Sequence, residues 1–151
     1  MAVSRGAGTE IIRSAYFEDI DSTDKTLIFG VQHHIYTVLS IIIYPTALNA
    51  TTDTCSITLV GYDSNAGTTA QSITLFTCNP QVASKETFVW NDKYSFNGHE
   101  PTDFTGPMDS IVKQDAIADQ GSSVVQKLIA TGTHASDSYN IGITFIDQNN
   151  A

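Results

Sequence analysis

Alternation of apolar and polar residues, without a helical period, runs through most of the chain. The strongest segment is IYTVLSIIIY at residues 35–44, which is apolar on both faces. One face would carry Ile35, Leu39, Ile41 and Ile43, and the other would carry Tyr36, Val38, Ile42 and Tyr44. Two apolar faces predict a central strand that is covered on both sides or lies at a subunit contact. We expect Pro45 to end this strand, because proline cannot donate to a sheet ladder.

Other segments show shorter versions of the same pattern. We expect strands at residues 10–17, 26–31, 54–62, 73–77, 81–90, 93–96, 124–130 and 139–146. Residues 111–118 fit either a short helix or an irregular strand. Turns rich in glycine, asparagine, aspartate and serine separate the segments. About eight short strands predict an all-β protein with an antiparallel β-sandwich, jelly-roll-like in its arrangement.

The length of 151 residues suits one domain. Residues 1–9 are small and polar and predict a flexible N-terminal arm, which leaves 10–151 as a single β-sandwich domain. The stretch NGHEPTDFTGPMD, residues 97–109, holds two prolines and two glycines. We therefore expect these thirteen residues to form a loop.

The sequence Ser-Ile-Thr-Leu occurs twice, at residues 56–59 and 72–75, on either side of a turn-rich connector. This arrangement predicts two strands of one hairpin rather than a repeat array. If the apolar residues share a face, Ile57 pairs with Leu75 and Leu59 pairs with Ile73. In that register Cys55 opposes Thr77. Cys78 then lies on the other face, and only a register slipped by one residue would bring the cysteines together. We therefore predict two free thiols, which fits assembly in a reducing cytoplasm.

The charge of the chain limits the classes of partner that we expect. The chain has 16 acidic and 7 basic residues and a net charge of -9, and its basic residues are scattered. Without a basic stripe to neutralise phosphates, nucleic acid is not an expected partner. No segment at the start resembles a signal peptide, and the apolar run at 38–44 is too short to cross a bilayer, so we expect no membrane partner.

Several combinations of polar residues resemble parts of metal sites. His33 and His34 are adjacent on an expected strand, so they would point to opposite faces and could not share one metal. His99-Glu100 is followed by Pro101 and lacks the second histidine of a helical zinc motif. Asp19, Asp21 and Asp24 resemble the start of a calcium loop, but its glycine and its final glutamate are missing. We expect surface or edge-strand histidines and a solvated acidic turn.

Catalytic chemistry has no recognisable signature either. Ser122-Ser123 lacks the glycine frame of a hydrolase nucleophile, and no phosphate-binding glycine loop is present. Asn49-Ala50-Thr51 is formally a glycosylation acceptor, but no signal peptide would bring it to that machinery. We therefore expect no catalytic residue, no metal site and no cofactor, and a protein that is not an enzyme.

Aromatic residues near the expected loops could belong to the core, to a protein interface or to a small ligand or sugar site. They are Tyr16, Phe17, Trp90, Tyr94, Phe96 and Phe104. The sequence leaves these alternatives open. A glycan-binding jelly-roll module would use Trp90 and Tyr94 as its stacking platform.

The order of segments resembles a known family. YTVLSIIIYPTALNATTDTCSITLVGYD, SITLFTCNPQVASKETFVW and QKLIATGTHASDSYNIGITFID together resemble small β-sandwich virion proteins of tailed bacteriophages. The shared pattern is a long apolar strand, a threonine-rich break, a hairpin, an edge strand and a final strand after an Ala/Ser/Asp turn. Residues 97–123 (Asn97 to Ser123) depart from this pattern and look like an inserted loop, which could hold the particular contact surface.

The resemblance implies a non-enzymatic virion structural protein. Its most direct form is a capsid decoration (cement) protein that stabilises the head surface through repeated protein–protein contacts. The implied partners are the major capsid protein or other virion proteins and further copies of the chain, and the implied location is the virion, assembled in the host cytoplasm. A neck or tail accessory protein and the glycan-binding module are the alternatives. If the arm orders on a neighbour, deleting residues 1–9 should weaken particle binding without unfolding the domain.

Overall fold

The structure is a computed structural model that describes residues 9–31, 34–62, 70–80, 86–101 and 123–149. These ranges contain strands and turns and no helix. The strands are β1 (Thr9–Ile20), β2 (Lys25–Phe29), β3 (His34–Ala47), β4 (Cys55–Tyr62), β5 (Ala70–Cys78), β6 (Phe88–Trp90), β7 (Tyr94–Asn97), β8 (His99–Pro101), β9 (Ser123–Val125), β10 (Lys127–Gly132) and β11 (Ser138–Asn149).

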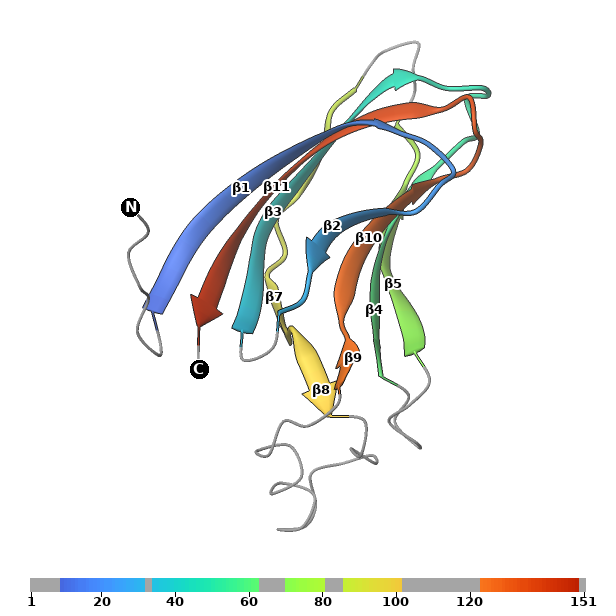
Figure 1. Ribbon diagram of the computed structural model, residues 1–151. Coiled ribbons are helices and arrows are strands. Elements are labelled where there is room, and N and C mark those ends of the chain that lie inside the picture. The colour runs from blue at the N-terminus through green and yellow to red at the C-terminus, as the bar shows by residue number, and fades with distance from the viewer. Residues whose placement is uncertain (1–8, 32–33, 63–69, 81–85, 102–122, 150–151) are drawn as a thin grey trace.

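Two antiparallel sheets form a sandwich (Figure 1). Sheet A has the order β1-β11-β3-β6, with β7 also paired to β3, and sheet B has the order β2-β10-β4-β5. The chain changes sheet between β1 and β2, between β2 and β3, between β3 and β4, between β5 and β6, and between β10 and β11. Between β7 in sheet A and β10 in sheet B it passes through the separate β8–β9 pair. Counting β6 and β7 as one position, this is the strand order of an eight-stranded jelly roll. The predicted fold class is confirmed.

The core lies between the inner faces of the two sheets. Sheet A contributes Val38, Ile41, Ile43, Tyr139, Ile141 and Ile143, and sheet B contributes Cys55, Ile57, Leu128 and Ala130, all at most 1% exposed. Each isoleucine or leucine buried in this way stabilises the fold by about 1.5–3 kcal/mol. Outer faces carry cross-strand pairs of hydroxyl side chains, such as Ser14 with Thr144 and Ser56 with Thr77. Hydroxyl pairs of this kind stabilise the contact between neighbouring strands, so serine and threonine are favourable on the outer faces.

β3 is central in sheet A, as expected, but two details of its prediction were wrong. The register with β11 shifts between Thr144 and Phe145, opposite Val38 and Ser40, so Leu39 is an extra residue in β3. This bulge turns Tyr36 and Val38 to the inner face together with Ile41 and Ile43.

Pro45 does not end β3. It is buried, pairs with Tyr139 of β11 at another register shift, and the strand continues to Ala47. On the other side of β3, the pairing with β6 runs only from Ile41 to Ile43. The missing N–H of Pro45 therefore interrupts no ladder there, which is the usual condition for proline in a strand.

The β4–β5 hairpin confirms half of the predicted register. Leu59 pairs with Ile73 as expected, but the register shifts beyond Thr58, so that Ile57 pairs with Phe76 and Cys55 pairs directly with Cys78. The prediction that the cysteines lie on opposite faces was wrong. The cause is packing: the shift turns the Phe76 ring inward, where it stacks on Trp90 with ring centroids 5.0 Å apart.

The ends of the expected inserted loop are strands. β8 and β9 pair with each other as a two-stranded ribbon, and His99, within β8, is the partner of Val125. The ribbon joins the sandwich where Gly98 N donates to His34 O at 2.9 Å and Gln126 N donates to Gly98 O at 2.9 Å. The predicted boundary of the loop at residue 97 was therefore placed too early.

Some expectations concern residues outside the described ranges. They include residues 1–8 of the predicted arm, 81–85 of an expected strand, the ambiguous segment 111–118, and His33, Phe104 and Ser122. Thr9, which the prediction gave to the arm, is the first residue of β1.

Candidate contact face

The outer face of sheet A carries a row of apolar side chains that no other part of the described chain covers. The strand register places Tyr16 of β1, Gly142 of β11, Ile42 of β3 and Val89 of β6 side by side. Tyr16 is 82% exposed, Ile42 is 43% exposed and Val89 is 50% exposed. Together with Tyr44 on β3, these side chains form what we call the apolar patch. An exposed apolar group of this kind on a sheet is typical of a binding surface.

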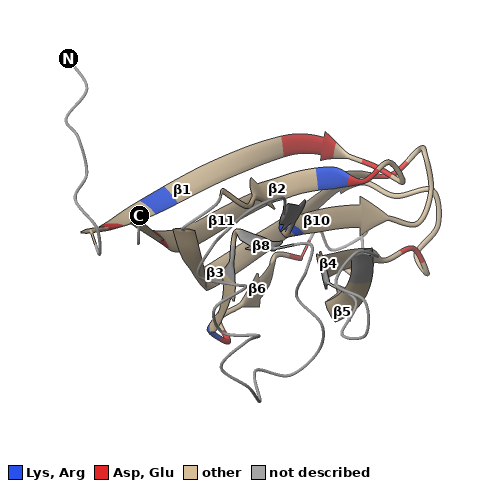
Figure 2. Ribbon diagram, turned by 60° about the horizontal axis from the view of Figure 1, so that its bottom comes forward, with Lys and Arg blue, Asp and Glu red and all other residues tan. Residues whose placement is uncertain are grey.

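Charge is scarce on this face. The charged side chains of β1 that share it, Glu10 and Glu18, stand near the two ends of the strand, and the described parts of β11, β3 and β6 add none. Figure 2 shows acidic segments at the arrowhead of β1 and in the turns beside it, and a basic segment toward the start of β1, with an uncharged stretch between them. In a chain of net charge -9, this is a surface where two copies can approach without bringing like charges together.

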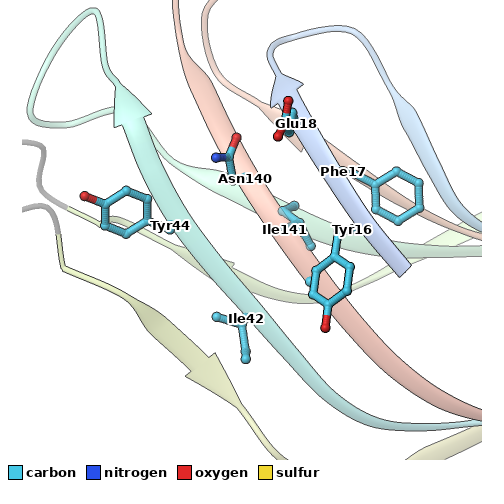
Figure 3. A pocket seen from close by; sticks show the side chains of 8 residues that line it. Tyr16, Phe17, Glu18, Ile42, Tyr44, Asn140 and Ile141 are labelled. Atoms are coloured by element: carbon cyan, nitrogen blue, oxygen red, sulfur yellow. The ribbon is translucent and has the colours of Figure 1, made fainter. Parts of the chain in front are cut away.

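A shallow groove of about 300 Å³ lies within the apolar patch. Tyr16 and Tyr44 stand on either side of it, with Ile42 and Asn140 between them (Figure 3). Glu18 lies at one end of the groove, and the ring of Phe17 points away from it. The groove offers two aromatic rings and one amide, a combination that suits an apolar side chain of a partner or the face of a sugar ring.

Gly142 determines where the Tyr16 ring lies. A Cβ atom at position 142 would come within 3.2 Å of two carbon atoms of that ring. The absence of a side chain therefore allows Tyr16 to lie over β11 and to form one wall of the groove.

The aromatic residues that the sequence singled out divide between the two faces of sheet A. Tyr16 is exposed, whereas Trp90, Tyr94 and Phe96 point inward in a chain of ring contacts that begins at Phe76. Trp90 and Tyr94 contact each other edge to face, with centroids 5.3 Å apart. They are core residues, so the predicted stacking platform of Trp90 and Tyr94 was wrong.

His34 belongs to a polar cluster on the inner face, at the end of β3 and β11. His34 Nδ1 lies 2.6 Å from Asp147 Oδ1, and Arg13 Nε donates to Asp147 Oδ2 at 3.2 Å. Asp147 is buried and satisfied by these neighbours, so the cluster fixes the ends of three strands. The expectation of a surface histidine was wrong for His34.

A second buried polar cluster links the turns at the opposite end of the sandwich. Asp137 accepts hydrogen bonds from the backbone N–H of Asn49 at 2.8 Å and of His134 at 2.9 Å. Asp53 accepts from the N–H of Ala50 at 3.1 Å. A hydrogen bond to the Asp137 carboxyl, together with burial, raises the pKa of Asp53 above its ordinary value. The Asp53 carboxyl therefore holds its proton more tightly in the fold than a free aspartate does.

The three aspartates of the acidic turn act separately. Asp21 Oδ1 accepts from the N–H of Thr23 at 2.7 Å, Asp24 Oδ1 accepts from Thr131 Oγ1 at 2.5 Å, and Asp19 Oδ1 accepts from Ser138 Oγ at 3.0 Å. Asp19 has a φ of 56°, at the register shift that ends β1. These contacts stabilise turns, and the carboxylates do not converge on one point.

Within the described ranges, no group of three or more His, Cys, Asp or Glu side chains is arranged to hold a metal ion. In the same part of the chain, no helix is long and apolar enough to cross a membrane. Two further residues considered from the sequence have structural places. Ser123, of the Ser122-Ser123 pair, lies in β9. The backbone N–H of Asn49, the formal glycosylation acceptor, donates to Asp137.

The sequence pattern does not indicate the apolar patch as a site, although Tyr16, Ile42 and Tyr44 all lie in expected strands. Their side-by-side arrangement depends on which strands neighbour each other in sheet A, which the sequence pattern does not give. The one available signal was the double-sided apolar character of residues 35–44, for which a subunit contact was one of the two interpretations.

Comparison with known proteins identifies no family for the chain. No family model matches the chain, and no curated protein matches it. Among solved structures, one from Bacillus endospore appendages, which form disulfide-linked pili, aligns with a TM-score of 0.39 and 12% identity, covering 100% of this chain and 97% of that one. A likeness at this level establishes neither a shared fold nor a shared function.

Proposed function

We propose that the chain is a non-enzymatic structural subunit that assembles with further copies of itself through the outer face of sheet A. The observation that carries this proposal is the apolar patch, exposed on a face that is almost free of charge. A side chain such as Ile42, exposed in one subunit, would have its apolar surface removed from water on contact with a second subunit, which favours association. The patch reaches the sheet edge, because β1 is the edge strand of sheet A.

The assembly we propose is the surface of a tailed-bacteriophage virion, where the chain decorates the capsid. Two features support the proposal of a virion. One is the order of sequence segments, which resembles small β-sandwich virion proteins, and the other is the jelly roll of short strands with polar turns. The partners are then other copies of the chain and the major capsid protein, and the location is the virion after assembly in the host cytoplasm.

Cryo-electron microscopy of particles that carry the protein tests this function. We expect regularly spaced copies on the capsid, with the outer faces of sheet A turned toward one another. The Tyr16→Ser/Ile42→Thr double variant should bind particles in lower amounts, and Ile73→Thr should bind as the wild type does. Ile73 is a suitable control because it is 67% exposed but lies in sheet B. Wild-type copies with this face in open solvent would contradict the proposal.

The groove favours one second candidate, a glycan-binding module with Tyr16 and Tyr44 as its aromatic walls. Calorimetric titration with a panel of oligosaccharides distinguishes the two functions. A sugar that binds the wild type and not Tyr44→Ala would favour glycan binding. The absence of heat with every sugar, together with self-association of the chain, would favour assembly.

A further inference from the structure

The two cysteines of the chain stand directly opposite each other. Cys55 is the first residue of β4 and Cys78 is the last residue of β5, and the shifted half of the hairpin register makes them partners. Both side chains are buried, and both are free thiols in this structure. The predicted free thiols are present, although the reason given for them was wrong.

The geometry of the pair suits a disulfide. Directly opposed residues in an antiparallel pair have Cα atoms about 4.5–5.5 Å apart, and disulfides span Cα distances of about 4.4–6.8 Å. The Cβ atoms must approach by up to about 1 Å to reach bonding distance. That movement is available, because β5 is the edge strand of sheet B and Cys78 is its last residue.

A cavity borders one of the two cysteines. It measures about 300 Å³ and is lined by residues 77–80 and 86–88, which include Cys78. Cys55 does not line it and is 0% exposed. An incoming reagent therefore reaches Cys78 first.

We propose that Cys55 and Cys78 form a thiol-modification site, which closes to an intramolecular disulfide by exchange with a small-molecule disulfide such as oxidised glutathione. In the first step, the Cys78 thiolate attacks one sulfur of the reagent, a mixed disulfide forms, and one glutathione leaves as a thiol. In the second step, the Cys55 thiolate attacks Cys78 Sγ and the second glutathione leaves. The two cysteines are oxidised by two electrons, and one glutathione disulfide is reduced to two thiols.

The reaction is slow at neutral pH. Burial raises the pKa of Cys78 to about 11, and burial next to Cys78 raises the pKa of Cys55 to about 12. Since the thiolate is the attacking species, the rate should rise with each step in pH up to that range. The closed form should resist thermal unfolding, because the bond joins residues 55 and 78 across a whole hairpin.

The test is to incubate the folded full-length chain with oxidised glutathione at about pH 8.5, then to denature it, alkylate it and measure its mass. We expect a monomer about 2 Da lighter than the reduced chain and with no alkylated cysteine, as two thiols become one disulfide. Its Tm should be about 5–10 °C higher, and dithiothreitol should reverse both changes.

Single variants test the order of the steps. Cys55→Ser should keep one glutathione on Cys78, because no second thiol can displace it, and Cys78→Ser should take up none. Two alkylatable thiols in the treated wild type, a persistent glutathione adduct on it, or a disulfide-linked dimer would each overturn the proposal. So would an adduct on Cys55 in Cys78→Ser.

Discussion

Individual buried polar groups in this sandwich differ in whether they have hydrogen-bond partners. Asp137 accepts two backbone N–H groups and holds the turns at residues 49–53 and 133–137. The Tyr139 hydroxyl, by contrast, is buried and has no hydrogen-bond partner among the described residues. Similar burial therefore predicts opposite effects of substitution.

Asp53 and Asp137 form a matched pair for substitution. Asparagine at 53 can still accept from Ala50 N–H and can donate to Asp137, whereas asparagine at 137 places an amide where two N–H groups need acceptors. We expect Asp137→Asn to lower the free energy of unfolding by about 1–3 kcal/mol and Asp53→Asn to raise it at neutral pH. Urea unfolding of both variants measures this, and equal losses would contradict the assignment.

The pH dependence of Asp53→Asn has a definite sign. The folded protein binds the Asp53 proton more tightly than the unfolded chain does, because its pKa is raised. The stability of the wild type therefore falls as pH rises through the folded pKa of this group. The gain from Asp53→Asn should be smallest near pH 3 and should grow toward pH 7. A gain that shrinks with pH would show that the carboxyl is ionised by preference in the folded state.

Two buried tyrosines give a second comparison. The Tyr36 hydroxyl accepts from the N–H of Val31 at 3.0 Å, whereas the Tyr139 hydroxyl has no partner within the described part of the chain. Tyr36→Phe should cost about 1 kcal/mol, and Tyr139→Phe should be neutral or stabilising. Thermal unfolding distinguishes them. A larger loss for Tyr139→Phe would mean that its hydroxyl has a partner in solution.

At the scale of elements, the β8–β9 ribbon depends on close backbone contact. Gly30, next to β2, and Gly98, between β7 and β8, meet at the junction where Gly30 N donates to Gln126 O at 2.8 Å. A Cβ at position 30 would lie 2.1 Å from Gly98 O, and one at position 98 would lie 2.0 Å from Val31 O. Both contacts are with backbone atoms, which cannot turn aside as a side chain can.

We expect Gly30→Ala and Gly98→Ala to destabilise the fold by about 2 kcal/mol or more. Gly61→Ala is the control, because its Cβ would meet the flexible Gln126 side chain at 2.9 Å. Chemical denaturation of the three variants provides the measurement. The prediction fails if Gly61→Ala is as costly as the other two.

Elements were more predictable than their pairings. Alternation predicted a strand at residues 54–62, and β4 runs from Cys55 to Tyr62. A half-buried strand needs apolar residues on one face and polar residues on the other, so its sequence alternates. The bulges at Leu39 and near Leu75 were not predicted. Each depends on how side chains pack against another strand, which alternation along one strand does not reveal. One such bulge decides whether Cys55 meets Cys78, so the thiol pair could not be predicted from alternation alone.

At the scale of the whole molecule, charge and apolar surface are separated. Sixteen acidic residues oppose association of copies over long distances, and the apolar patch favours it at contact. Added salt screens the first effect and leaves the second. We expect the dissociation constant for self-association to fall as sodium chloride rises from about 0.05 to 0.5 M. Association that weakens with salt would point to an interface of ion pairs instead.

The central claim is that the outer face of sheet A binds a second copy. Sedimentation equilibrium of the wild type, Ile42→Asp and Ile73→Asp tests it most directly, because each variant adds one charge at an exposed isoleucine, on sheet A or on sheet B. We predict reversible association of the wild type and of Ile73→Asp, and association about 100-fold weaker for Ile42→Asp, since its charge would be buried without a partner. A wild type that is monomeric at every concentration, or an Ile42→Asp variant that associates as tightly as the wild type, would contradict the account.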